Sequence, residues 1–168
     1  MLTRVVVLLF FWCGISLAAP AQTPFPDRCL GVWKGTLHLY YQGVVKDSVP
    51  VRMTVARTAD PAVWAWKTEY LSVKNPVVKD YALKLTDKAA NRYVTDEGNG
   101  ILLDTYLVGD KLYNVFEVSG NLLTATYERV GENLIFEVTS GKKGETTGEG
   151  VVNYTVRNVQ RVVFRKEK

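Results

Sequence analysis

A series of short strands is predicted between Gly98 and Gly141. Glycines recur at positions 98, 109, 120, 131 and 141, so that a turn falls every ten or eleven residues. Glycine supplies the positive φ that a tight hairpin turn needs. Apolar residues alternate with polar ones in the runs between these turns, which are Ile101–Val108, Leu112–Val118, Leu122–Val130 and Leu134–Thr139. This spacing is typical of an antiparallel meander.

The meander also predicts its own register. Two-residue turns would place five pairs of apolar residues opposite each other: Leu107 and Leu112, Leu103 and Phe116, Val118 and Leu123, Tyr127 and Phe136, and Ala125 and Val138. One face of the sheet is then apolar, and the other carries Asp104, Lys111, Glu117, Glu128 and Glu137. A slip of one residue would mix the two faces, so the three turns agree on one buried face.

The same alternation extends over most of the chain from Gly31 onward. Further strands are predicted over Gly31–Gln42, Val49–Arg57, Val63–Ser72, Val77–Thr86 and Asn91–Asp96, with a final strand that bends near Arg157-Asn158 and ends at Arg165. A short helical turn is possible at the start of the segment from Leu30. Hairpin order without long crossovers favours closure. The predicted fold is all-β: a single antiparallel up-and-down β-barrel of about 8–10 strands.

The N-terminus has the pattern of a signal peptide. Arg4 precedes an apolar core, Val5–Leu17, that is short for a membrane span, and Ala19-Pro20-Ala21 fits a cleavage site. We therefore predict a cleavable signal over residues 1–21 and a periplasmic or secreted protein that is not lipidated. A retained membrane anchor is the alternative. A loose, proline-containing leader is expected over residues 22–30, and the barrel domain over 31–168.

Composition limits the classes of partner and chemistry. Removal of residues 1–21 from the 168 leaves 147, enough for one domain with a real core. The net charge of +4 is spread along the chain without a basic run interleaved with aromatics, which argues against nucleic-acid binding. Cys29 would be the only cysteine left, so it is either a free thiol, which we favour, or an intermolecular bridge.

One short pattern resembles a known family. Gly31-Val32-Trp33 on the first strand, together with Arg161 or Arg165 on the last, resembles the calycin pattern shared by lipocalins and fatty-acid-binding proteins. Residues 31–165 also resemble secreted bacterial lipocalin-like proteins without an assigned activity, through Val78–Tyr81, Asp96–Ile101, Phe116–Val118 and Val159–Arg161. The resemblance implies that Arg161 or Arg165 covers Trp33 at the floor of the barrel, which is a structural role. It implies a fold and no chemistry.

Catalytic chemistry finds little support in the residues. His38 is the only histidine, and alternation places it on the outer face, away from any haem, metal or triad inside the barrel. We expect no metal, no cofactor and no catalytic residue. One enzymatic alternative stays open, a lyase or isomerase that uses Asp96 or Glu97 as an acid or base; a raised carboxyl pKa would favour it.

The predicted inner face is rich in aromatic residues, which suits a pocket for one small apolar or amphipathic ligand. We expect the ligand at the wide end of the barrel, against Trp64, Trp66, Tyr70, Tyr81, Asn114 and Tyr127. Buried Asn114 would need a partner, and Tyr127 is its predicted cross-strand neighbour. The alternative is a filled core in an interaction or envelope-structural module, whose contacts would be the outer tyrosines 40, 106 and 113.

Overall fold

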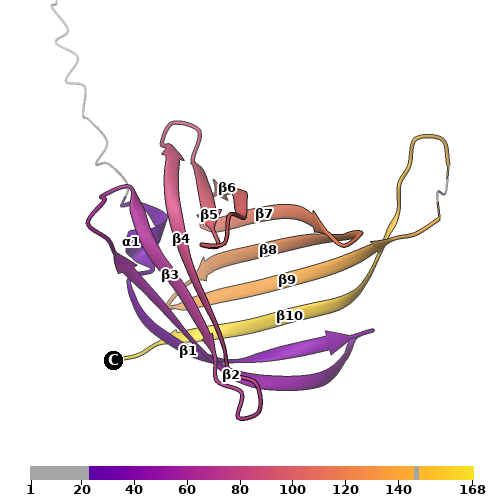
Figure 1. The fold of residues 1–168 in the computed structure, drawn as a ribbon, viewed down its shortest axis with the longest axis horizontal. Helices are drawn as coiled ribbons and strands as arrows, with labels where there is room; N and C mark the ends of the chain where they lie inside the picture. Colours follow the sequence, from indigo (N-terminus) through magenta and orange to yellow (C-terminus); the bar gives the residue numbers. More distant parts are fainter. Residues whose placement is uncertain (1–22, 146–147) are drawn as a thin grey trace, which may run out of the picture.

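The computed structural model describes residues 23–145 and 148–168 (Figure 1). One short helix, α1 (Phe25–Arg28), precedes ten strands: β1 (Gly31–Tyr41), β2 (Val44–Arg57), β3 (Val63–Tyr70), β4 (Val77–Asp87), β5 (Arg92–Asp96), β6 (Leu102–Val108), β7 (Lys111–Val118), β8 (Asn121–Val130), β9 (Asn133–Lys143) and β10 (Tyr154–Lys166). The predicted signal peptide lies outside the described residues. Within them, no helix has the length and apolar character needed to cross a membrane.

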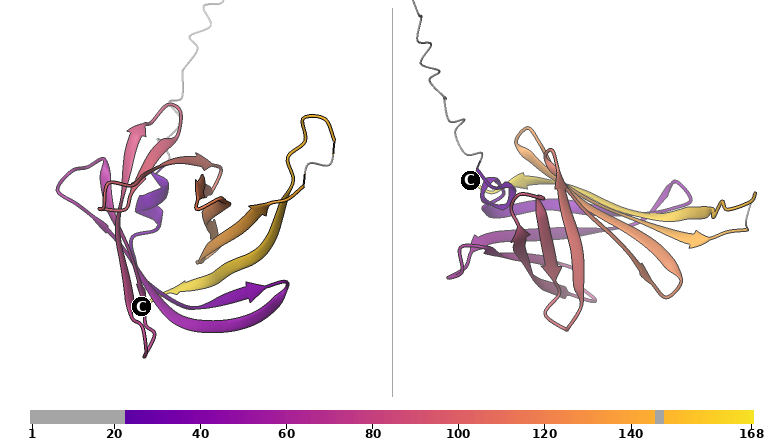
Figure 2. Two further views of the ribbon diagram at one scale, coloured as in Figure 1. Left: turned by 45° about the vertical axis from the view of Figure 1, so that its right-hand side comes forward. Right: turned by 90° about the horizontal axis from the view of Figure 1, so that it is seen from above.

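The strands form a closed antiparallel barrel. Each strand pairs with its neighbours in sequence, and β1 pairs with β10 to complete the ring. The predicted up-and-down, lipocalin-like barrel is confirmed. Figure 1 shows α1 at one end, near the C-terminus, while the adjoining ends of β9 and β10 project at the other. The views in Figure 2 show the same arrangement.

Much of the predicted register is confirmed. Leu107 pairs with Leu112, Tyr127 with Phe136 and Ala125 with Val138. Positive φ angles of 60° at Gly109 and 57° at Gly131 support these hairpins, as the spacing predicted.

Two predicted pairs are wrong. The β7–β8 turn falls on Ser119-Gly120, with φ of 51° and 73°, so Leu123 faces Phe116 and not Val118. Two consecutive positive φ angles fit the right-handed twist of a hairpin. The shift is two residues, so every side chain keeps its predicted face. Leu103 pairs with Thr95 on β5 and not with Phe116, because β6 and β7 are paired only near their shared turn.

The first hairpin is longer than predicted. Gln42 and Gly43 form a tight turn with φ of 50° and 79°, so β2 already begins at Val44 and not at Val49. A bulge between Leu39 and Tyr40 then shifts the β1–β2 register. The predicted bend in the last strand is confirmed, since the β9–β10 register shifts between Val156 and Asn158.

The segment before β1 is part of the core. Phe25 and Cys29 are 1% and 0% exposed, so the expectation of a loose leader was wrong. Pro24 precedes the first helical residue and Pro26 stands within the first turn, where a missing N–H costs little. The helical turn therefore forms before Leu30 and not after it. Cys29 is a free thiol, and burial raises its pKa to about 12.

Polar contacts fasten α1 across one end of the barrel, here called the capped end. Trp33 Nε1 donates to the Cys29 carbonyl at 2.7 Å, and Trp64 Nε1 donates to Asp27 Oδ1 at 2.8 Å. Arg28 forms an ion pair with Asp110 in the β6–β7 turn at 2.7 Å. The half of the barrel next to α1 is consequently filled with packed side chains, including Trp33, Trp64, Leu37, Met53 and Phe164, each 2% exposed or less.

Candidate functional site

The opposite end of the barrel, the mouth, is hollowed. One hollow of about 640 Å³ lies between the ends of β1 to β4 and β10, with Leu39, Asp47, Val49, Tyr70, Lys79 and Gln160 among its lining residues. A second hollow of about 410 Å³ reaches Leu123, Val138 and Ser140 on β8 and β9. Both hollows are lined by Leu39, Asp47 and Gln160. We call the two together the mouth hollow.

A group of aromatic rings fills the middle of the barrel, below the strand ends that form the mouth. Trp66 and Tyr127 meet edge to face with centroids 5.2 Å apart, and Tyr127 stacks on Phe136 at 4.6 Å. Burial raises the pKa of Tyr127, with a smaller opposing effect from hydrogen bonding to Trp66 and Thr68. The phenol therefore stays neutral over the physiological pH range.

The rim of the mouth is polar. Asp47 and Lys79 are exposed and Gln160 is half-buried, and all three line the mouth hollow. Lys79 Nζ lies 5.8 Å from the centre of the Tyr81 ring. Burial, and then the neighbouring Glu97 carboxylate, raise the pKa of Tyr81, so its hydroxyl remains a neutral hydrogen-bonding group. An apolar wall under a polar rim suits a ligand with one apolar and one polar end.

The predicted ligand residues divide into two groups. Tyr70 lines the mouth hollow directly. Tyr81 adjoins it beside Lys79, and Trp66 and Tyr127 belong to the aromatic group of the barrel interior. Trp64 instead lies at the capped end, where it is 1% exposed and bonded to Asp27.

Asn114 is also separate from the mouth hollow. It faces Ala125 across the β7–β8 ladder, so Tyr127 is not its cross-strand neighbour. Asn114 Nδ2 donates to Thr105 Oγ1 at 2.5 Å and to the Asp104 carbonyl at 3.2 Å. The neighbouring strand β6 therefore supplies both acceptors for this buried amide.

The floor of the barrel differs from the prediction in the residues that cover Trp33. Arg129 Cζ lies 4.9 Å and Lys166 Nζ 5.8 Å from the centre of the Trp33 ring. Arg161 forms an ion pair with Glu137 on the outer wall at 3.2 Å. Arg165 lies opposite Lys34 in the β1–β10 ladder, so neither arginine covers the ring. Alternation explains this correction, because Arg161 and Arg165 share the face opposite to the buried Phe164.

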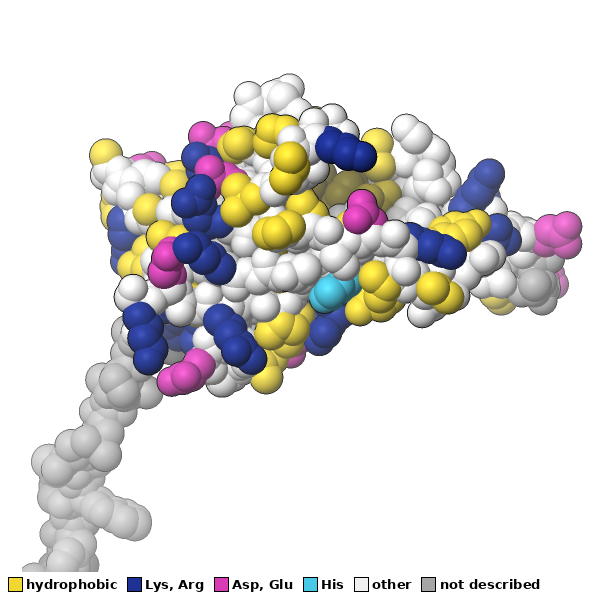
Figure 3. All heavy atoms as spheres, turned by 90° about the horizontal axis from the view of Figure 1, so that it is seen from below, with side chains coloured by type: hydrophobic (Ala, Val, Ile, Leu, Met, Phe, Trp, Pro, Cys, Tyr) yellow, Lys and Arg dark blue, Asp and Glu magenta, His cyan; other side chains and the backbone are white. Residues whose placement is uncertain are grey.

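His38 lies on the outer wall, as predicted. Its Nδ1 is 2.8 Å from Ser48 Oγ, and it lines a shallow groove with Lys34, Arg161 and Arg165. Figure 3 shows His38, in cyan, among apolar and basic side chains on this face. Among the described residues, no group of three or more His, Cys, Asp or Glu side chains is arranged to hold a metal ion.

The carboxylates singled out for acid–base chemistry have other surroundings. Lys84 Nζ lies 2.6 Å from Asp96 Oδ2, and the Gly98 amide donates to Asp96 Oδ1 at 2.8 Å. These hydrogen bonds lower the pKa of Asp96, which is the opposite of what a general acid at neutral pH requires. Asp96 thus acts as a turn residue that closes the β5–β6 connection.

The outer tyrosines do not form one surface. Tyr106 and Tyr113 pair directly on β6 and β7 and are 44% and 37% exposed. Tyr40 lies on β1, with β10, β9 and β8 between it and β7 around the barrel. An interaction surface on the outer face would therefore use Tyr106 and Tyr113 without Tyr40.

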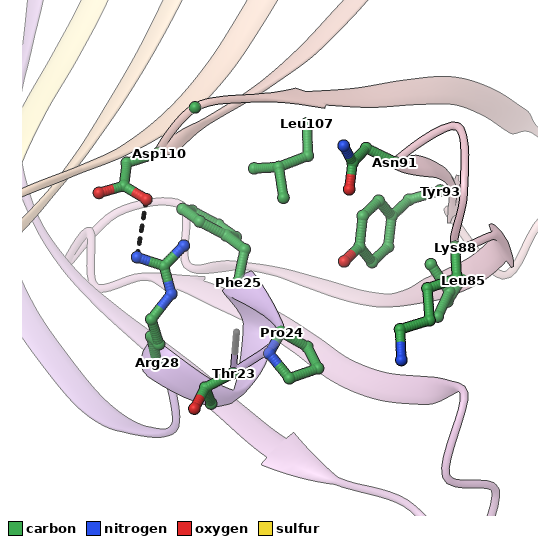
Figure 4. A pocket seen from close by; sticks show the side chains of 11 residues that line it. Thr23, Pro24, Phe25, Arg28, Leu85, Lys88, Asn91, Tyr93, Leu107 and Asp110 are labelled. Carbon is green, nitrogen blue, oxygen red and sulfur yellow. Dashed lines mark ion pairs between the residues drawn. The ribbon is translucent and has the colours of Figure 1, made fainter. Parts of the chain in front are cut away.

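A further hollow of about 590 Å³ lies at the capped end, between α1 and the β4–β5 and β6–β7 turns. Figure 4 shows Phe25 and Tyr93 beside it, and the Arg28–Asp110 ion pair at its edge. Burial raises the pKa of Tyr93. This hollow lies beside the helix, whereas the mouth hollow lies among the strand ends and the β3–β4 connection at the opposite end of the barrel.

Sequence reasoning missed the polar residues of the mouth. Asp47, Lys79 and Gln160 continue the alternation of the apolar inner face on β2, β4 and β10, where Val49, Tyr81 and Val162 are the next inward residues. This alternation could have identified them, because each is a polar residue near a strand end at an even number of positions from the inward-facing residues. For Asp47 the signal was hidden, because the strand was expected to begin only at Val49.

The closed ring of ten antiparallel strands is a lipocalin-like barrel. No protein-family model matches the chain, and no curated protein matches it in sequence. Among solved structures, the chain is similar to the S-type phycobiliprotein lyase CPES from Guillardia theta, with a TM-score of 0.62, 8% identity and coverage of 86% of this chain and 91% of that one. It is also similar to Rv2717c from M. tuberculosis, with a TM-score of 0.55, 12% identity and coverage of 87% and 99%. The fluorescent protein UnaG matches at a TM-score of 0.45 and 20% identity, over 84% and 98%. These likenesses show the fold alone.

Proposed function

We propose that this protein binds a small amphipathic molecule non-covalently in the mouth hollow. The observation that carries the proposal is the contrast between the two ends of the barrel. The capped end is covered by α1, and its hollows of about 590 and 700 Å³ lie beside that helix and among basic side chains, whereas no helix covers the mouth, whose hollow of about 640 Å³ combines apolar walls with a polar rim. That volume falls within the range of about 300–1,000 Å³ typical of small-molecule pockets.

The lining defines the chemistry of the ligand. Leu39, Val49 and Tyr70 supply apolar contact surface for a hydrocarbon or aromatic body. Asp47 and Lys79 carry opposite charges at the rim, and Gln160 adds an amide that both donates and accepts. The apolar end of the ligand would lie on the walls, and a polar end would face these three residues.

We further propose that the protein acts in the periplasm or outside the cell. The supporting observation is the N-terminal pattern of Arg4, an apolar core and small residues before the barrel. A carrier or sensor of amphipathic molecules is consistent with such a location. Mass determination of the N-terminus of the exported protein tests this part of the proposal, and retention of residues 1–21 would contradict it.

The binding test uses an apolar fluorescent dye such as an anilinonaphthalene sulfonate, followed by competition with a mixed lipid extract. The dye is excited directly and its emission is recorded against protein concentration. We expect saturable enhancement, because dye in the mouth hollow leaves water. Leu39→Trp adds a large ring at a residue that lines both parts of the hollow, and should lower dye affinity about tenfold or more by occupying the space.

Two control variants make the test specific. Val163→Trp adds the same ring on the outer face of β10, where Val163 is 39% exposed, and should leave dye binding unchanged. Tyr113→Ala removes an outer tyrosine and should do the same. Equal dye binding by Leu39→Trp and the wild type would refute the mouth site. Loss of binding in Tyr113→Ala alone would instead place the apolar contact surface on β6 and β7.

A further inference from the structure

The capped end carries a second kind of site, formed by basic side chains. A hollow of about 700 Å³, here called the basic hollow, is lined by Arg28, Arg129, Arg165, Lys166 and Lys168 together with Trp33, Asn133, Glu132 and Glu167. Five basic residues thus face two acidic ones. Glu167 is already paired, since Lys34 Nζ lies 2.5 Å from its carboxylate. The basic residues come from α1, β8 and the C-terminal end of β10, which only the closed barrel brings together.

The two arginines that approach from α1 and β8 each retain an unused donor. Arg28 Nη1 is engaged by Asp110 at 2.7 Å, and Arg129 Nη2 donates to the Gly131 carbonyl at 3.0 Å. Arg28 Nε and Arg129 Nη1 are buried and have no hydrogen-bond partner among the described residues. Buried polar groups are nearly always satisfied, so an unpaired nitrogen on each of two arginines that line one hollow indicates that both guanidinium groups have unused hydrogen-bonding capacity there.

The surrounding charge favours an anion as the acceptor that would use this capacity. Arg129 and Lys166 both lie against the ring of Trp33, so two positive charges gather around one side chain of the hollow. Burial raises the pKa of the nearby Cys29 thiol, and Arg129, Arg28 and Lys166 act in the opposite direction, as expected of a positive potential at this end. A guanidinium group presents its N–H donors in a planar fork that suits the oxygens of phosphate.

We propose that the basic hollow binds a phosphate-bearing anion through Arg28 and Arg129. A phosphate group offers several acceptor oxygens, enough for both free guanidinium donors and for the ammonium group of Lys166. The hollow is larger than a phosphate ion, which leaves room for the organic part of a phosphorylated molecule. The anion can be a soluble phosphate compound or the head group of a phospholipid, and the two share the same recognition chemistry.

The test measures phosphate binding by isothermal titration calorimetry at constant ionic strength. Inorganic phosphate and glycerol 3-phosphate serve as soluble probes, and vesicles of phosphatidylcholine with or without phosphatidic acid serve as lipid probes. Saturable binding of a soluble probe supports the proposal with a soluble source. Sedimentation with phosphatidic-acid vesicles only, lost in the variants below, supports it with a lipid source.

The variants separate hydrogen-bond geometry from charge. Arg129→Lys keeps a cation over Trp33 but removes the guanidinium fork, and we expect affinity to fall about tenfold or more. Arg28→Lys is the second such variant, and it keeps the test decisive if thermal melting shows that Arg129→Lys is unfolded. Lys143→Gln removes an exposed charge at the mouth end of β9 and should leave binding unchanged.

Three results would overturn the proposal. The first is no saturable binding of any probe to the wild type. The second is wild-type affinity in both arginine-to-lysine variants, which would mean that the guanidinium donors are not used. The third is an equal loss of affinity in Lys143→Gln, which would indicate general attraction of anions to a basic protein. Because the basic hollow and the mouth hollow lie at opposite ends of the barrel, dye binding at the mouth neither supports nor contradicts this site.

Discussion

Asp27 provides the sharpest test of how the capped end is held together. Its side chain is only 9% exposed and accepts from Trp64 Nε1 at 2.8 Å and from Arg57 Nη2. Asp27→Ala leaves the indole N–H of Trp64 buried without an acceptor, which costs about 1–3 kcal/mol. The lost ion pair adds at most about 1 kcal/mol, because the Arg57 side chain is 48% exposed. We expect the free energy of unfolding to fall by about 1–4 kcal/mol in total.

Asp27→Asn refines this expectation. The amide oxygen can still accept from Trp64 Nε1, so the loss should be only about 1 kcal/mol. Trp64→Phe removes the donor, and a double-mutant cycle with Asp27→Ala should give a coupling energy of about 1–2 kcal/mol.

Urea unfolding followed by circular dichroism measures these differences. Asp104→Ala is the matched control, because its ion pair with Arg92 joins side chains that are 60% and 45% exposed. It should change the free energy of unfolding by less than about 0.5 kcal/mol. The reasoning is refuted if Asp27→Ala costs no more than Asp104→Ala, or if the cycle with Trp64→Phe shows no coupling.

Two further predictions concern barrel closure and pH. Gly35→Ala would place a Cβ 2.8 Å from the Val163 carbonyl oxygen, where β1 meets β10, and should lower the free energy of unfolding in urea by about 1–3 kcal/mol. Gly141→Ala is the control, because the nearest atom to its added Cβ would be 3.3 Å away, and it should lower the free energy of unfolding by less. Equal losses of stability in the two variants would contradict the argument. Lys84→Met should raise the pKa of Asp96 toward its ordinary value of 3.8 in a carboxyl NMR titration. Because the folded-state pKa of Asp96 is depressed, its contribution to stability is present above that ordinary value and is lost as pH falls through the folded-state pKa. Lys84→Met should therefore reduce the loss of stability as the pH is lowered. An unchanged Asp96 titration would exclude Lys84 as the cause of the depressed Asp96 pKa.

The mouth shows how far residue patterns reach toward a site. Tyr70 was expected to contact a ligand because alternation placed it inward, and it does line the mouth hollow. Trp64 has the same inward parity but lies at the capped end, bonded to Asp27. Alternation predicts the face of a strand on which a residue lies, but it does not predict which part of the barrel interior is packed with side chains. The packed part is the end covered by α1, a helix that lies in the segment predicted to be a loose leader.

The sequence by itself determined the strands, their faces and the closed meander, because alternation and regularly spaced glycines act locally. The pairing of Tyr127 with Phe136 followed from a two-residue turn alone. Only the tertiary structure decided which end of the barrel is open. It placed Phe25 in the core, gave Asn114 its partner in Thr105, and brought Arg28 and Arg129 to one hollow. Arg28 and Arg129 are distant in sequence, and no local period encodes how far a closed barrel will be filled from either end.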